Sequence, residues 1–272
     1  MIANIAIQED MLPGRTILEK FEQAKALGIQ GIEFWGRDLS PKVPQIVEAI
    51  ERTGVKAASV NHGRQGRFLD PHPIERDRAL AELRQSIMDA VDIGAQGVIF
   101  VPHFFGPLLP DLSPYMDVMQ LEEELLYTHF RTLSDYADAM GVDLYLEPIN
   151  RYETHFLNRL EQAAAITRRV NHPRVKIVAD LFHMALEERD MAQAIRDHKN
   201  DIGHVHLADS NRRLPGQGLI DFAAIAAALN EIGYTGWGAF ECGEPGNNAD
   251  RAQEYLNDMP ACLEYLKRAG IT

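Results

Sequence analysis

Eight short apolar segments recur along the chain, and this repeat constrains the fold more than any other feature. They are rich in Val, Ile and aromatic residues, and they are continuous rather than alternating, which is typical of strands buried on both faces. Helical patterns lie between them, so the unit of roughly 30 residues indicates a repeated βαβ connection. The segments span residues 3–7, 31–35, 55–60, 97–101, 142–147, 175–180, 202–207 and 236–241.

Eight such units predict a closed (β/α)8 TIM barrel that occupies residues 1–272 as a single domain. The length of 272 residues, 46% of them hydrophobic, is sufficient for one barrel core. The structural alternative is an open doubly wound sheet, which usually carries a GxGxxG turn after its first strand. That turn reads QEDMLPGR here, which favours the barrel.

Composition excludes several classes of protein. The two cysteines, Cys242 and Cys262, are far apart, which argues against a disulfide framework and a cysteine-based zinc site. A net charge of −13 counts against nucleic-acid binding. No apolar run is long enough to span a membrane, and the N-terminus does not resemble a signal peptide. We therefore expect a cytoplasmic protein without nucleic-acid or membrane partners, and a homo-oligomer is left open.

Four residues of types that commonly bind metals lie at or near the ends of the last four predicted strands: Glu147, Asp180, His206 and Glu241. Barrel enzymes build their sites at this rim, where neighbouring strands lie about 4.8 Å apart. Three carboxylates this close cannot all stay ionised without a cation. A single acidic residue there is more often a helix cap or a solvated loop residue, but four in succession favour a metal site.

The ligand types indicate which ion to expect. Three oxygen ligands and one imidazole suit Mn²⁺, which we expect first, or Mg²⁺ or Co²⁺. A structural zinc site would instead favour cysteine and four closed positions. An octahedral ion leaves room for two adjacent oxygens of a substrate.

Further polar residues lie in loops beside this rim. His183 follows Asp180 by three residues, and a core or capping role is its alternative. Arg212 lies in the loop HLADSNRRLPGQG, where an arginine could clamp substrate oxygens, and the next residue, Arg213, could equally be solvated. His62 and His103 follow the third and fourth strands and either line the pocket or have structural roles.

Four segments carry a resemblance to a known family: LEPINRYETHFLN, ADLFHMALEE, GHVHLADSNRRLPGQG and AFECGEPG. They resemble the xylose isomerase-like sugar isomerase and epimerase superfamily, and look most like D-tagatose 3-epimerase and related ketose 3-epimerases. Hydroxypyruvate isomerase and inosose dehydratase are more distant relatives. The epimerases tend to read NRxPPG where this chain has NRRLPG, so Arg213 and Leu214 depart from the pattern.

The resemblance implies roles for individual residues. Glu147, Asp180, His206 and Glu241 would bind the divalent metal, and Glu147 and Glu241 would also be the acid/base pair. Substrate-contacting residues of the epimerases would correspond to Glu153, His183 and Arg212, and His62 is added as a candidate from its place after the third strand.

The expected reaction is epimerisation at C3 of a ketose or ketouronic acid through an enediolate, with the two glutamates on opposite faces of the sugar. The same site could instead support aldose–ketose or hydroxypyruvate-type isomerisation, or an inosose dehydratase-like elimination.

Two distant alternatives share the barrel. Asp180, His183 and the HVHLAD run also look like parts of the multi-zinc site of endonuclease IV-like nucleases, to which His62 and His103 could add ligands. Such nucleases carry an Asp-x-His pair after the seventh strand, where this chain has NRRLPGQG, and the acidic charge opposes a phosphate backbone. The other alternative is a barrel that binds a sugar without turning it over.

Overall fold

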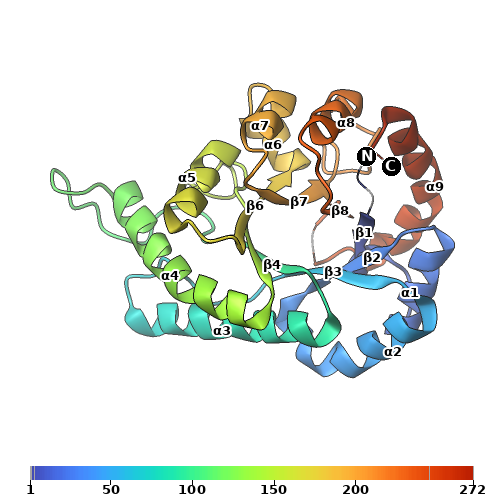
Figure 1. Ribbon diagram of the computed structural model, residues 1–272, viewed down its shortest axis with the longest axis horizontal. Helices are drawn as coiled ribbons and strands as arrows, with labels where there is room; N and C mark the ends of the chain where they lie inside the picture. The colour runs from blue at the N-terminus through green and yellow to red at the C-terminus, as the bar shows by residue number, and fades with distance from the viewer. Residues whose placement is uncertain (1, 3, 245, 272) are drawn as a thin grey trace.

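The eight predicted strands form one closed, all-parallel barrel in the computed structural model, which describes residue 2, residues 4–244 and residues 246–271 (Figure 1). Each strand pairs with its neighbour in sequence, and pairing of the first with the last closes the ring. This confirms the (β/α)8 fold; Ala3, at the start of the first predicted strand, lies outside the described residues. The strands are β1 (Asn4–Gln8), β2 (Gly31–Trp35), β3 (Lys56–Asn61), β4 (Gly97–Phe100), β5 (Asp143–Leu146), β6 (Val175–Asp180), β7 (Ile202–Leu207) and β8 (Trp237–Phe240).

Helices surround the barrel and connect its strands (Figure 1). Short 3-10 turns occupy Glu9–Met11, Gly36–Asp38, Ser40–Lys42 and Ala249–Arg251. No helix in the described parts of the chain is both long and apolar enough to cross a membrane. The helices are α1 (Ile17–Ala26), α2 (Val43–Thr53), α3 (Pro73–Ile93), α4 (Val118–Met140), α5 (Leu160–Val170), α6 (Leu181–Glu187), α7 (Met191–Asp197), α8 (Phe222–Glu231) and α9 (Ala252–Ala269).

Local sequence signals explain where several helices end. Gly54, Gly94 and Gly141 each close a helix in the left-handed conformation, as their positions before a strand indicate. At the start of α8, the Asp221 side chain accepts hydrogen bonds from the N–H groups of Ala223 and Ala224. Such caps fix the helix ends, and therefore the loops that lead into and out of the barrel.

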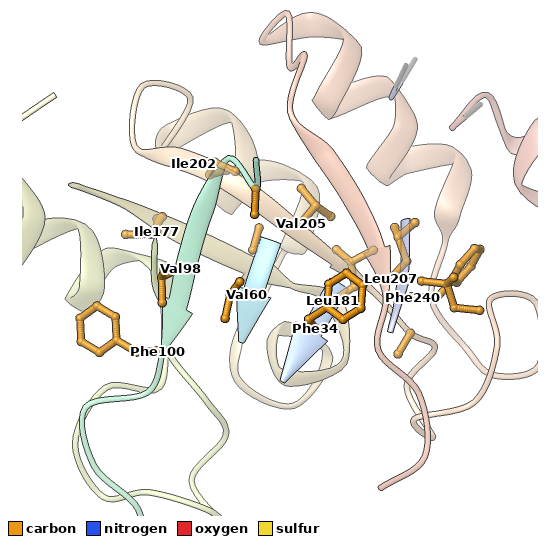
Figure 2. Close-up of a cluster of buried hydrophobic side chains, with 14 of the residues drawn as sticks. Phe34, Val60, Val98, Phe100, Ile177, Leu181, Ile202, Val205, Leu207 and Phe240 are labelled. Atoms are coloured by element: carbon orange, nitrogen blue, oxygen red, sulfur yellow. The ribbon is translucent and has the colours of Figure 1, made fainter. Parts of the chain in front are cut away.

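The hydrophobic core lies between the strands and the helices (Figure 2). Phe34, Val60, Val98, Phe100, Ile177, Leu181, Ile202, Val205, Leu207 and Phe240 belong to this buried cluster. In a separate, smaller cluster Tyr145 packs with Ile99 and Val178. Gly203 makes room for it, because a Cβ atom there would come within 2.6 Å of the Tyr145 ring.

The connection after β4 is long, and part of it extends away from the barrel beyond the first turn of α4, at the left of the view (Figure 1). The first residues of this connection stay near the strand ends and form backbone hydrogen bonds with the loop after β5. The Phe105 N–H donates to Glu153 O at 2.6 Å, and the His155 N–H donates to Phe105 O at 3.0 Å. These bonds make the two loops one continuous wall beside the strand ends.

Candidate active site

The four residues that the sequence places at strand ends converge on one point. Glu147 follows β5, Asp180 ends β6, His206 lies in β7 and Glu241 follows β8. All four are buried, and each offers a ligand atom within 4.8 Å of the others. His206 Nδ1 lies 2.8 Å from Glu147 Oε1, 3.3 Å from Asp180 Oδ2 and 3.4 Å from Glu241 Oε2. One ring nitrogen therefore faces three carboxylates.

This cluster places three carboxyl groups and one histidine in a buried environment, so negative charge is in excess there. Burial raises the pKa of Glu241 well above its ordinary value, and the carboxylates of Glu147 and Asp180 add to that effect although His206 opposes it. Burial would lower the pKa of His206, but Glu241 and the other carboxylates outweigh it and raise that pKa. A single N–H cannot satisfy so many acceptor lone pairs, so the residues present fit a divalent cation.

The other nitrogen of the His206 ring points to Glu33 in β2, a residue with no role predicted from the sequence. His206 Nε2 lies 3.3 Å from Glu33 Oε1, and His204 Nε2 lies 3.0 Å from Glu33 Oε2. The Ser59 hydroxyl donates to Glu33 at 2.6 Å. Burial would raise the pKa of Glu33, but the two histidines, together with these bonds, hold it well below its ordinary value. Glu33 is therefore an ionised carboxylate that fixes the orientation of His206.

Gln8 connects this buried carboxylate to the rim. Its amide nitrogen donates to Glu33 Oε1 at 3.1 Å and to Glu241 Oε1 at 2.7 Å. Asn61 also donates to Glu241 Oε1, at 3.1 Å. The sequence signal for Glu33 was a polar residue inside a strand that is buried on both faces, whereas Gln8 lay one residue beyond the first predicted strand, 3–7, and the structure extends β1 to include it.

A cavity of about 610 Å³ opens above the cluster. Glu147 and Glu241 lie in its wall, and so do the predicted substrate-binding residues Glu153, His183, Arg212 and His62. His103 lines it as well, and its Nε2 bonds to Gly106 O at 2.7 Å. Six of the eight predicted site residues thus line one concave site of the size usual for small-molecule binding, and the other two, Asp180 and His206, belong to the buried cluster that shares Glu147 and Glu241 with it.

His183 presents a defined hydrogen-bonding edge to this cavity. The backbone N–H of Asn150 donates to His183 Nδ1 at 3.1 Å, and the Asn150 side-chain nitrogen lies 2.8 Å from the same atom. Because Nδ1 accepts, the proton of the neutral ring lies on Nε2. His183 can therefore donate a hydrogen bond from Nε2 to a substrate oxygen.

Arg212 is held over the cluster by a tightly bonded loop. Its Nη1 donates to Glu153 at 3.2 Å, and its Nη2 lies 3.8 Å from Glu241 Oε2. The guanidinium also stacks over Phe182 at 4.8 Å. Arg212 has a positive φ of 57°, a conformation that tertiary contacts must impose on it.

The buried Asp209 carboxylate organises this loop by accepting backbone N–H groups of Ser210, Gly216 and Ile220. The two residues that depart from the epimerase pattern lie outside the cavity wall. Arg213 is exposed and Leu214 is buried in the core.

The ligands of a multi-zinc nuclease do not assemble around His62 or His103. Within the described residues, the groups of side chains close enough to hold an ion are the four-residue cluster above and Glu33 with His204 and His206. The two groups share His206.

Comparisons with known proteins agree with this architecture. A family model described as "Xylose isomerase-like TIM barrel" matches residues 21–259. The chain is 30% identical over 239 residues to a 3-dehydro-D-guloside 4-epimerase of Escherichia coli (strain K12), a match that covers 87% of this chain and 91% of the relative. A shorter match, 41% identical over 113 residues, relates 42% of the chain to 38% of a D-psicose 3-epimerase of Enterocloster bolteae.

Among solved structures, the crystal structure of a 3-keto-D-glucoside 4-epimerase from E. coli superposes with a TM-score of 0.85 at 27% identity, and covers 97% of this chain and 99% of that one. These matches confirm the resemblance inferred from the sequence motifs. The chain belongs to the xylose isomerase-like TIM barrel family.

Proposed function

We propose that the protein is a divalent-metal-dependent epimerase of keto-sugars, which inverts a hydroxyl-bearing carbon next to the carbonyl. The observation that carries the proposal is that Glu147 and Glu241, which follow the first and last of four neighbouring strands, cluster with Asp180 and His206 and both line one cavity. Relatives named as keto-sugar epimerases support it. Glu147, Asp180, His206 and Glu241 would hold the ion, with Mn²⁺ expected first.

The ion, when bound, would polarise the substrate carbonyl and stabilise the negative charge that develops on it. The two glutamates divide the proton transfers between them. One carboxylate would take the proton from the carbon next to the carbonyl to give an enediolate, and the other would return a proton to the opposite face. Inversion at that carbon is the result, with no net change in composition.

Three further side chains would orient the sugar. His183 would donate from Nε2 to a substrate oxygen, and the Arg212 guanidinium would neutralise charge beside the enediolate. Glu153 already accepts a hydrogen bond from Arg212, so it would set the position of the guanidinium and accept from a hydroxyl.

The position of the carbonyl decides which carbon is inverted. For a 2-ketose the reacting carbon is C3, as the sequence resemblance predicts. For a 3-keto-sugar it is C4, as in the name of the relative matched over most of its length. Both reactions use the same enediolate chemistry, and so does aldose–ketose isomerisation, which returns the proton to the carbonyl carbon instead.

Deuterium incorporation from D2O tests the proposal. Metal-loaded protein is incubated with D-psicose and with a 3-keto-glucoside, and the products are read by NMR. Deuterium at the inverted carbon supports epimerisation, whereas deuterium at the former carbonyl carbon identifies isomerisation. Glu147→Gln and Glu241→Gln should each lower turnover at least a hundredfold, because each removes one of two required proton carriers. More than a few per cent of wild-type activity in either variant would exclude the two-base scheme.

A further inference from the structure

The cavity extends well beyond the cluster of Glu147, Asp180, His206 and Glu241. The smaller part of its wall comes from Glu147, Ile149, Glu153, His183, Arg212 and Glu241. The larger part comes from Trp35, which ends β2, and from the end of β3 and the loops that follow β3 and β4, as far as Leu108. We name this larger part, lined among others by Trp35, His62, Arg64, Phe68, Phe104 and Phe105, the outer subsite.

The volume of the cavity exceeds what one hexose requires. Even at the ~30 Å³ that a water molecule takes in the liquid, the roughly twelve heavy atoms of a hexose would fill ~360 Å³. The cavity measures about 610 Å³, so more than a third of it remains for another group. At this generous allowance the remainder of ~250 Å³ holds at least ~8 further heavy atoms, which is enough for a ring-sized group although it is less than the ~360 Å³ given to the first hexose.

His62 places an unused hydrogen-bond donor in the wall of the outer subsite. The side chain is 4% exposed, and its Nε2 has no hydrogen-bond partner among the described residues. Its Nδ1 lies 3.0 Å from the hydroxyl of Ser86, which accepts a bond from Arg64 Nε at 3.2 Å. The Ser86 hydroxyl can then donate its own hydrogen bond to His62 Nδ1, and in that arrangement the ring proton of His62 lies on Nε2. A buried donor left without a partner costs free energy, which a ligand oxygen would recover.

Aromatic side chains supply the apolar part of the outer subsite. Phe104 and Phe105 line the cavity although they are 51% and 77% exposed. Phe105 has a positive φ of 66° and is fixed by backbone bonds to Glu153 and His155. The electron-rich face of an aromatic ring attracts the C–H groups of a sugar ring. The exposed rings are therefore held at the mouth in positions where a ligand would cover them.

We infer that the substrate is a keto-glycoside, whose second ring or ring-sized aglycone occupies the outer subsite and accepts a hydrogen bond from His62. The inference rests on the proposed epimerase function. A glycosidic bond at the anomeric carbon of a 2-ketose would consume its carbonyl, so a glycoside linked there keeps its ketone only on another ring carbon. The reacting sugar is thus a 3-keto-sugar or a similar ring ketone, and the linked group lies away from the enediolate.

Three substrates of increasing size test this inference: D-psicose, a methyl 3-keto-glucoside and a 3-keto disaccharide of two glucose units. The value of kcat/KM is measured for each with metal-loaded protein. We expect the disaccharide to exceed the methyl glycoside at least tenfold. His62→Ala and Phe105→Gly should each reduce this ratio to about threefold or less. Glycine keeps the positive φ at residue 105, so that variant removes the ring and preserves the loop.

Tyr152→Ala is the matched control, because Tyr152 is an aromatic residue with 80% exposure that does not line the cavity. It should leave the ratio unchanged. Equal kcat/KM values for the two glycosides, or an equal loss on both in the His62 and Phe105 variants, would overturn the outer subsite. Absence of deuterium exchange into all three substrates would instead overturn the proposed function. The ratio is internal to each variant, so a general loss of stability cannot imitate the expected result.

Discussion

Replacement of Glu33 by Gln tests whether the carboxylate beneath His206 controls metal binding. Glu33 is fully buried, and it faces His206 Nε2 at 3.3 Å and His204 Nε2 at 3.0 Å. A glutamine would turn an amide NH₂ toward one of these nitrogens, so the proton of His206 would lose its charged acceptor. The ring could then move its proton to Nδ1, the nitrogen that faces the three carboxylates and would bind the ion.

The magnitude follows from the burial of this contact. Loss of a carboxylate that orients a metal-binding histidine typically costs 10- to 100-fold in affinity, or about 1.4–2.7 kcal/mol. The complete burial of Glu33 and its hydrogen bond from Ser59 at 2.6 Å place the expected effect in the upper half of that range. We therefore expect Glu33→Gln to weaken Mn²⁺ or Co²⁺ binding by roughly 30- to 100-fold.

Calorimetric titration of metal-free protein measures this affinity without reference to turnover. The visible spectrum of bound Co²⁺ reports in addition whether the ligand set has changed. Ser59→Ala is the control, because it removes one hydrogen bond from Glu33 and keeps the charge, so a loss of about 1 kcal/mol or less is expected. A folded Glu33→Gln protein that binds either metal within threefold of wild type would refute the argument.

Other predictions concern stability. Burial and the neighbouring Arg64 lower the pKa of His62 to about 4, below the value near 6.5 in the unfolded chain. Between pH 4 and pH 6.5 the unfolded state therefore binds more protons at His62 than the folded state does. The free energy of unfolding, fully supported above pH 6.5, should fall by about 2 kcal/mol from pH 7 to pH 5 through this group. Urea unfolding of His62→Gln should lack this part of the loss, and an identical loss in both proteins would contradict it. Gly203→Ala should lower the free energy of unfolding by roughly 1–3 kcal/mol, because the new Cβ would meet the Tyr145 ring. Gly106→Ala is the control: a Cβ there would meet open space, so the free energy of unfolding should change by less than about 0.5 kcal/mol. Mn²⁺ at a hundredfold excess over its dissociation constant should stabilise the chelator-treated protein by about 2.7 kcal/mol, and Asp180→Asn should abolish the accompanying rise in Tm; an equal rise in that variant would place the ion elsewhere.

The sequence by itself determined the barrel and the composition of the strand-end cluster. Both can be read from short stretches of sequence. Apolar segments that alternate with helical patterns indicate the barrel, and a residue at the C-terminal end of a barrel strand always lies at the mouth of the barrel. Glu147, Asp180 and Glu241 could therefore be assigned to one rim without coordinates. Asp221 at the start of α8 is likewise a local signal, because an aspartate at that position caps the helix whatever lies elsewhere in the chain.

Only the tertiary structure decided which strand residues point into the barrel and what meets there. Glu33 looks like one residue of an ordinary buried strand, and its contact with His206 joins positions 173 residues apart. Ring closure and strand stagger set that contact, and neither is encoded within a single segment. The outer subsite has the same origin, since Trp35 at the end of β2 and His62 and Phe105 in the connections after β3 and β4 are brought to one cavity by the closed barrel. Side chains at strand ends are positioned by the backbone near them in sequence, whereas the partners that orient them are positioned by the closure of the whole ring.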